Sequence, residues 1–146
     1  MPRITPIARI LLGLAFTVFA LNYFVPFLPP PRHELSPLAL SFLGGFAGAG
    51  YMTLIKVIEL VAGLALLSNR FVPLALALLA PIIVGIVTFH ARLVPGLAIP
   101  SVVLVLELYL AWAYRDAFAP MLRAKVVPAP NTPTATPLPV SSRLGS

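Results

Sequence analysis

Four long apolar stretches divide the chain, and polar side chains interrupt each of them only rarely. At about 1.5 Å per helical residue, each stretch spans roughly 27–33 Å, which is close to the thickness of a bilayer's hydrocarbon core. Because backbone groups in lipid must satisfy their hydrogen bonds internally, the stretches are predicted to be helices rather than open strands. The predicted helices run approximately over residues 6–27, 50–67, 71–91 and 97–117.

The connections between these helices differ in length. Residues 68–70 form a very short turn, and Pro73 suits the first turn of the helix that follows. Residues 92–96 make an equally tight link to the fourth helix. The long connection, residues 26–49, ends in LSPLALSFLGGFAGAG, which is apolar but too short and glycine-rich to span. We therefore expect an interfacial or re-entrant segment on the external face between the first two helices.

Composition supports lipid as the solvent of this chain. The 146 residues are 60% hydrophobic and 10% charged, whereas soluble domains carry about 25% charged residues. The beginning of the chain, MPRITPIARILLGLAFTVFA, also resembles a signal peptide. Its apolar run continues to Phe27, longer than the usual core of a signal peptide, so a retained membrane helix is favoured.

Lysine and arginine in the connections predict the orientation, because cytoplasmic loops carry an excess of them. The predicted cytoplasmic side holds seven lysine and arginine residues and the other side holds two, so both termini are expected in the cytoplasm. The basic residues do not cluster on a soluble module, and we expect no nucleic-acid binding. The seven are Arg3, Arg9, Arg70, Arg115, Arg123, Lys125 and Arg143, and the two are Arg32 and Arg92.

The sequence predicts one transmembrane domain, residues 1–123, and a tail, residues 124–146. The tail contains VVPAPNTPTATPLPVSSRLGS, which is rich in proline and threonine and has no helical period, so we predict that it is disordered.

Catalytic and metal-binding motifs are missing from the sequence. The absence of cysteine excludes disulfides, thiol redox chemistry and cysteine-ligated metals. The two histidines, His33 and His90, do not form a paired intramembrane set, so no haem or metal site is expected. There is also no nucleophile elbow, phosphate loop or dinucleotide fingerprint, and the chain is not expected to be an enzyme by itself.

Polar side chains within the helices are the remaining candidates for a site. Lys56 and Glu59 lie three residues apart in the second helix, and Gly63 on the same face would allow a neighbouring backbone to approach. With the predicted topology, these two groups and three from the other helices fall in the outer half of the membrane. The three are Asn22, His90 and Glu107, and Tyr114 shares a helix face with Glu107.

Two interpretations of this cluster are open. In the structural one, Lys56 pairs with Glu59, while Asn22 and Glu107 tie helices together. In the functional one, the groups line a pocket, because ionisable groups inside a membrane are costly and usually face a cavity or pathway. The second carboxylate, Glu107, leaves an excess negative charge that a proton, a cation or a ligand must compensate, and this imbalance favours the pocket.

Three segments of the chain resemble the DoxX-like family of small bacterial membrane proteins. They are ARILLGLAFTVFALNYF, GYMTLIKVIELVAGLALLSNRFVPLALALLAPIIVGIVTFH and LELYLAWAYRDAFAPML, and the resemblance covers roughly residues 8–122. It implies an all-α, four-helix bundle in the bacterial inner membrane. Relatives are linked to quinone-coupled oxidation of sulfur compounds and to membrane oxidoreductase complexes.

These observations favour an accessory subunit of a membrane redox complex, with a pocket of Lys56, Glu59, Glu107, Asn22, His90 and Tyr114. No residue here can itself carry electrons, so a redox centre would belong to a ligand or a partner. No covalent cofactor is expected, and quinone or lipid is the expected ligand class. A small-solute or proton carrier and a purely structural subunit remain alternatives. Expected partners are the lipid bilayer and other membrane subunits or further copies of the chain.

Overall fold

The computed structural model describes residues 3–30 and 34–129, and this part of the chain contains helices and no strand, as predicted. Its elements are α1 (Ile4–Phe24), α2 (Pro37–Gly48), α3 (Tyr51–Leu67), α4 (Val72–Arg92), α5 (Ala98–Ala113), α6 (Arg115–Phe118) and the 3-10 helix η1 (Ala119–Leu122).

Two of the helices, α1 and α4, are each 21 residues long and apolar enough to cross a membrane. Two pairs of consecutive helices meet the same criteria when the two members of a pair are counted as one span, although each pair is bent. The angle between α2 and α3 is 79°, and that between α5 and residues 115–122 is 73°. The described residues therefore contain two helices that are long and apolar enough to cross a membrane, or up to four if each bent pair is one span, which is consistent with a membrane protein.

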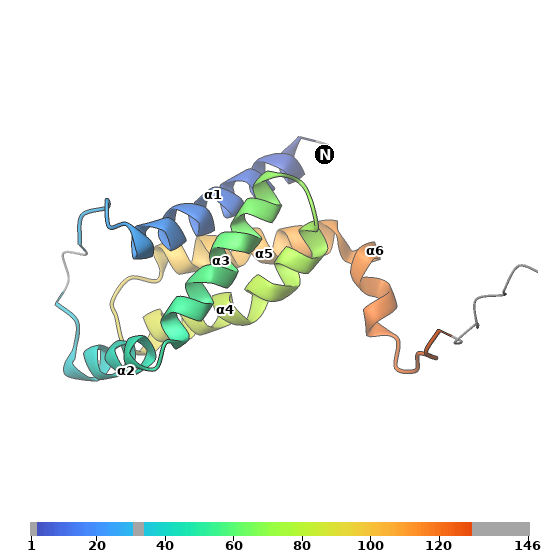
Figure 1. Cartoon of the computed structure of the whole chain (residues 1–146). Coiled ribbons are helices and arrows are strands. Elements are labelled where there is room, and N and C mark those ends of the chain that lie inside the picture. Colours follow the sequence, from blue (N-terminus) through green and yellow to red (C-terminus); the bar gives the residue numbers. More distant parts are fainter. Residues whose placement is uncertain (1–2, 31–33, 130–146) are drawn as a thin grey trace, which may run out of the picture.

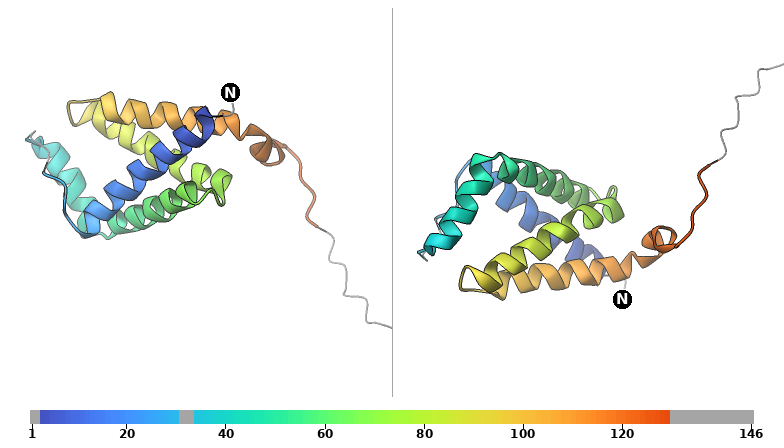
Figure 2. Two further views of the ribbon diagram at one scale, coloured as in Figure 1. Left: turned by 90° about the horizontal axis from the view of Figure 1, so that it is seen from above. Right: turned by 90° about the horizontal axis from the view of Figure 1, so that it is seen from below.

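The long helices pack side by side (Figures 1 and 2). Helix α1 contacts both α3 and α5, α4 also contacts both α3 and α5, and the contacts thus close a cycle. Helix α2 contacts α3 and lies at one end of the four, turned away from their direction (Figure 1). The side chains buried between the helices are almost all apolar, and the largest fully buried apolar ones are Leu12, Leu66, Leu76, Leu79, Ile83 and Leu110.

Glycine allows α1 and α3 to cross closely. A Cβ atom added to Gly63 would lie 2.6 Å from the Thr17 hydroxyl, 2.9 Å from the Thr17 backbone nitrogen and 3.0 Å from the Gly13 carbonyl oxygen. Small residues at helix crossings let two backbones approach in this way. The prediction that Gly63 admits a neighbouring backbone is confirmed.

Two helix ends differ from the prediction. The first helix ends at Phe24 rather than residue 27, because Val25 precedes a proline and adopts an extended conformation (φ −132°, ψ 92°). The last long helix ends at Ala113 rather than 117, since Tyr114 leaves the helical region (φ −100°, ψ 17°) and the chain turns there.

Arg9 does not lie in a connection. It lies in α1, is 9% exposed, and its Nη1 donates a hydrogen bond to the carbonyl oxygen of Leu66 and another, at 3.5 Å, to that of Leu67. The last carbonyls of a helix carry the negative end of its dipole, so they attract this cation. Arg9 therefore joins the beginning of α1 to the end of α3 instead of lying free among lipid headgroups.

Part of the predicted tail, residues 124–129, is described and contains no helix or strand. Residues 130–146, including Arg143, lie outside the described residues, as do Arg32 and His33. The predicted disorder of the tail therefore stays a prediction.

Candidate functional site

A cavity of about 830 Å³ lies between the helices at the end where α1 stops and α5 begins. All five helices from α1 to α5 contribute to its walls, and most of the lining side chains are aliphatic or aromatic. Its polar side chains are Asn22, Tyr23, Lys56, Glu59 and His90. Four of the six predicted site residues thus face one cavity, although they come from three separate helices.

Lys56 and Glu59 form an ion pair on the wall contributed by α3. The distance from Lys56 Nζ to Glu59 Oε2 is 2.7 Å, so the predicted i, i+3 pairing is confirmed. The Glu59 side chain is only 2% exposed, whereas that of Lys56 is 19% exposed. The carboxylate is therefore the deeper member of the pair, and the ammonium group is the one that a ligand in the cavity can approach.

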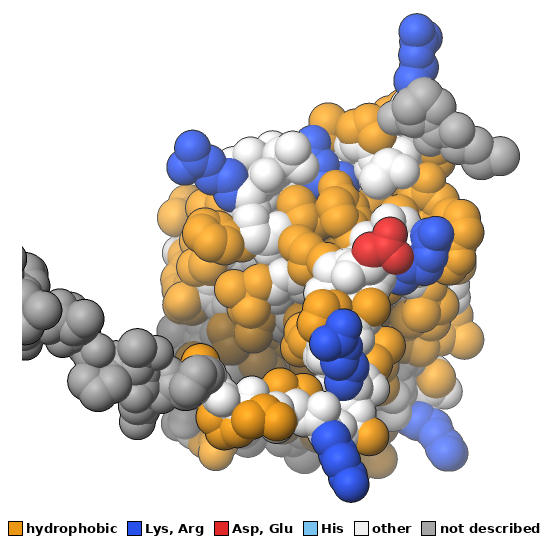
Figure 3. Space-filling view, turned by 90° about the vertical axis from the view of Figure 1, so that its right-hand side faces the viewer, with side chains coloured by type: hydrophobic (Ala, Val, Ile, Leu, Met, Phe, Trp, Pro, Cys, Tyr) orange, Lys and Arg blue, Asp and Glu red, His pale blue; other side chains and the backbone are white. Residues whose placement is uncertain are grey.

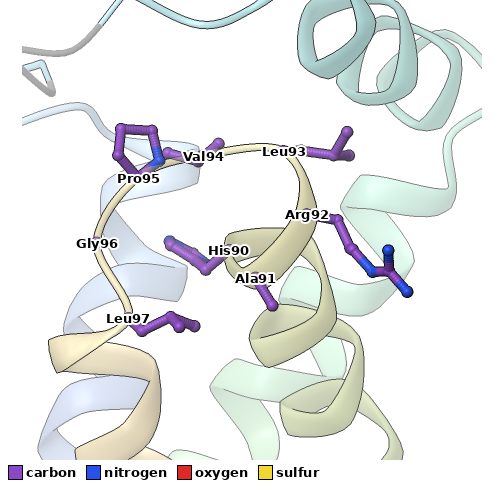
Figure 4. A pocket seen from close by; sticks show the side chains of 8 residues that line it. All are labelled: His90, Ala91, Arg92, Leu93, Val94, Pro95, Gly96 and Leu97. Atoms are coloured by element: carbon purple, nitrogen blue, oxygen red, sulfur yellow. The ribbon is translucent and has the colours of Figure 1, made fainter.

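His90 lies near the end of α4, next to the α4–α5 loop. Its Nδ1 lies 2.8 Å from the carbonyl oxygen of Ile86, to which it donates, and this leaves Nε2 free for another partner. A smaller hollow of about 470 Å³ in the loop, residues 90–97, is also lined by His90 (Figure 4). In that view the imidazole lies on the side of Gly96, while Arg92 points away from it.

Asn22 stabilises the chain beyond α1 rather than another helix. Its Oδ1 accepts hydrogen bonds from the backbone nitrogens of Phe27 at 2.9 Å and Leu28 at 2.7 Å. The link between helices here is made by Tyr23, whose hydroxyl lies 2.9 Å from Thr53 Oγ1. The expectation that Asn22 ties helices together is therefore wrong. Tyr23 directly follows Asn22 in the sequence but was not among the predicted site residues.

Glu107 is buried but does not line the cavity. It is 5% exposed, and its Oε2 has no hydrogen-bond partner among the described residues. On α5 it follows the cavity-lining Pro100 and Val103 along one face and precedes the core residue Leu110. Glu107 thus lies on the helix face between the cavity and the apolar core.

Tyr114 lies at the other end of α5, after the last helical residue. It packs against the apolar core and is not part of the cavity wall. The structure brings neither Glu107 nor Tyr114 to the cavity that Lys56 lines.

Helix α2 covers one side of the cavity through Leu43, which the sequence analysis did not identify. Stacked aromatic rings hold this helix in place: Phe42 lies 4.8 Å from Phe46 and 5.7 Å from Phe89 of α4, measured between ring centroids. Tyr51, the first residue of α3, lies 6.0 Å from Phe46. The apolar segment between the first two long helices therefore forms part of the cavity wall.

Within residues 3–30 and 34–129, no group of three or more histidine, cysteine or acidic side chains could hold a metal ion. The arrangement offers instead a largely apolar space with one ammonium group, one carboxylate and one imidazole nitrogen. Pockets of this kind bind small organic molecules, with a few polar groups fixing the ligand's orientation.

No family model, curated protein or solved structure matches the chain. The resemblance to DoxX-like proteins therefore stays a prediction from the three sequence segments quoted above.

Proposed function

We propose that this protein is a DoxX-like, multi-pass protein of the bacterial inner membrane and binds a quinone or a lipid in its cavity. In this role it is a non-catalytic accessory subunit of a membrane redox complex. The observation that carries the proposal is the cavity of about 830 Å³, which is apolar except for a few polar groups that include Lys56, Glu59 and His90. Ligand pockets for small organic molecules have volumes of about 300–1,000 Å³.

The residues of the cavity suit a ring with carbonyl groups and an apolar chain. Lys56 Nζ can donate a hydrogen bond to a quinone carbonyl, and the aliphatic and aromatic walls suit an apolar chain. Because Nδ1 of His90 donates to Ile86, its Nε2 is an acceptor and suits a hydroxyl group of the reduced quinol. A quinone would supply the electron-carrying chemistry, which this chain's own side chains lack.

The proposed topology has α1, α3, α4 and α5 crossing the membrane as a four-helix bundle. Both termini are cytoplasmic, and α2 lies at the external interface. The lysine and arginine distribution supports this orientation, and the closed cycle of helix contacts supports the bundle. A periplasmic reporter fused after Lys125 should therefore be inactive, and one fused within the loop at residues 92–96 should be active. Strong activity of the Lys125 fusion would contradict the topology.

Ligand binding is tested by blocking the cavity. A short-chain ubiquinone should raise the unfolding temperature of the full chain in detergent, because a ligand that binds only the folded state stabilises it. Val103→Phe places a ring in the cavity wall and should abolish this shift. Val105→Phe is the matched control, since Val105 is 63% exposed on the outside of the same helix, and it should retain the shift.

An unchanged unfolding temperature at saturating ubiquinone, or an equal shift in both phenylalanine variants, would contradict quinone binding in this cavity. Isolation of the protein from native membranes then tests whether it belongs to a redox complex. We expect it to be recovered together with dehydrogenase or oxidase subunits.

A proton or small-solute carrier is the second candidate. The buried Glu107, whose Oε2 has no partner among the described residues, favours it, because unpaired acidic groups in membranes mark proton and ion pathways. Recovery of a homo-oligomer alone, together with solute or proton flux in proteoliposomes that Glu107→Gln abolishes, would support this candidate over the redox subunit.

A further inference from the structure

The chain changes direction sharply after α5. Residues 115–122, which comprise α6 and η1, make an angle of 73° with α5. Arg115 holds this turn, since its Nη1 donates to the Trp112 carbonyl oxygen at 3.1 Å and its guanidinium lies 5.0 Å from the centroid of the Trp112 ring. Membrane helices tilt by about 20° from the bilayer normal on average. If α5 crosses the membrane, the segment after it therefore runs closer to the membrane plane than to its normal.

This segment and the residues up to 127 expose large apolar side chains beyond the packed helices. Met121, Leu122, Val126 and Val127 are between 71% and 88% exposed, while Phe118 packs against the core and holds the segment to the rest of the protein. Apolar groups this exposed on a short segment beside a membrane indicate contact with the interface between headgroups and acyl chains.

Cations accompany these apolar side chains. Residues 115–127 contain Arg115, Arg123 and Lys125, against the single acidic residue Asp116. The only salt bridge among the described residues joins Lys56 and Glu59, so these cations have no carboxylate partner in that part of the chain. Lysine and arginine side chains also gather on this end of the protein, with apolar side chains between them (Figure 3).

We propose that residues 115–127 form a surface anchor that lies on anionic lipid headgroups of the membrane that α5 crosses. The exposed apolar side chains enter the interface, and Arg115, Arg123 and Lys125 contact phosphate groups. Anionic lipids match the uncompensated positive charge of this end, and the attraction grows with each added lysine or arginine near the surface. The anchor rests on the membrane topology proposed above and is independent of the ligand in the cavity.

A spin label tests the anchor in the full chain, because the protein has no cysteine of its own. Leu122→Cys carries the label in the segment, and Val105→Cys carries it on the exposed side of α5. Each protein is reconstituted into phosphatidylcholine vesicles with and without phosphatidylglycerol. The Leu122 label should be shielded from a water-soluble relaxing agent only where phosphatidylglycerol is present.

Charge variants then identify the contacts. Arg123→Gln with Lys125→Gln should lower the ratio of surface-bound to free segment roughly 30-fold, given the usual contribution of each cation. Arg92→Gln, an exposed cation at the end of α4, is the matched control and should leave the ratio unchanged.

A Leu122 label that remains accessible to water in both lipids would overturn the anchor, as would equal shielding in neutral and anionic vesicles. Broadening of its spectrum by a second label would instead show contact between two copies and would also overturn it. The Val105 label separates these failures from a failure of the topology. If that label is buried in hydrocarbon, α5 crosses the membrane whatever the segment does.

Discussion

Replacing Lys56 with methionine should lower the free energy of unfolding by about 3 kcal/mol, because the change leaves Glu59 as a buried acidic group without its partner. Glu59 is 2% exposed, and the structure gives it no other side-chain partner among the described residues. Thermal unfolding of the full chain in detergent, followed by circular dichroism, measures the loss.

Glu59→Gln should cost less, since a glutamine oxygen can still accept a hydrogen bond from Lys56, and the Lys56 side chain is 19% exposed. The double change Lys56→Met with Glu59→Gln should recover most of the stability, because neither residue is then left charged and unpaired. The coupling energy of this double-mutant cycle isolates the pair. Leu54→Met, on the exposed side of α3, is the control and should have little effect. Strictly additive single changes would contradict the ion pair.

A larger residue at Gly63 should force α1 and α3 apart. Its Cβ atom would lie within 3.0 Å of two backbone atoms of α1, and backbone atoms cannot move aside as a flexible side chain can. Overpacking of this kind costs about 1–3 kcal/mol and sometimes more, so Gly63→Val should reach at least the upper end of that range. The unfolding temperature in detergent measures the effect.

Gly85→Val is the matched control, since Gly85 also lies within a long helix but a Cβ there meets no atom within 4 Å. This variant should unfold close to the temperature of the unchanged protein. Equal destabilisation at the two glycines would contradict the close crossing and would point to helix propensity as the cause.

The positions of the long helices were predictable, because apolar length and short connections determine them. The exact ends of these helices depend on single residues, and the apolar pattern alone does not show which residues those are. Val25 leaves the helix because Pro26 follows it, although the apolar run continues to Leu28. Tyr114 ends α5 within a run that still contains Ala113, Ala117 and Phe118, and nothing in that pattern indicates a turn of 73°.

The candidate site was predictable as a set of groups at one depth, but not in its detailed contacts. The predicted depth along the helices placed Asn22, Lys56, Glu59 and His90 at the same level of the membrane, and all four line the cavity. Glu107 shares a face of α5 with the cavity-lining Val103 but lies one turn further along the helix, beyond the end of the cavity, and the sequence does not show where the cavity ends. The role of Asn22 was missed because its partners are backbone nitrogens five and six residues later, which no side-chain pattern reveals.

The contact between Arg9 and the carbonyl oxygen of Leu66 implies an order of events during biosynthesis. The acceptor is 57 residues further along the chain, and translation proceeds at about 5–20 residues per second. Roughly 3–11 s therefore pass between the synthesis of Arg9 and that of Leu66, whose carbonyl oxygen accepts the hydrogen bond from the guanidinium. During that interval α1 is expected to stay shallow, with Arg9 held at the phosphate level, and to seat fully only when α3 arrives. A chain that ends before Leu66 would thus lack the acceptor of Arg9, and its α1 is expected to keep this shallow position.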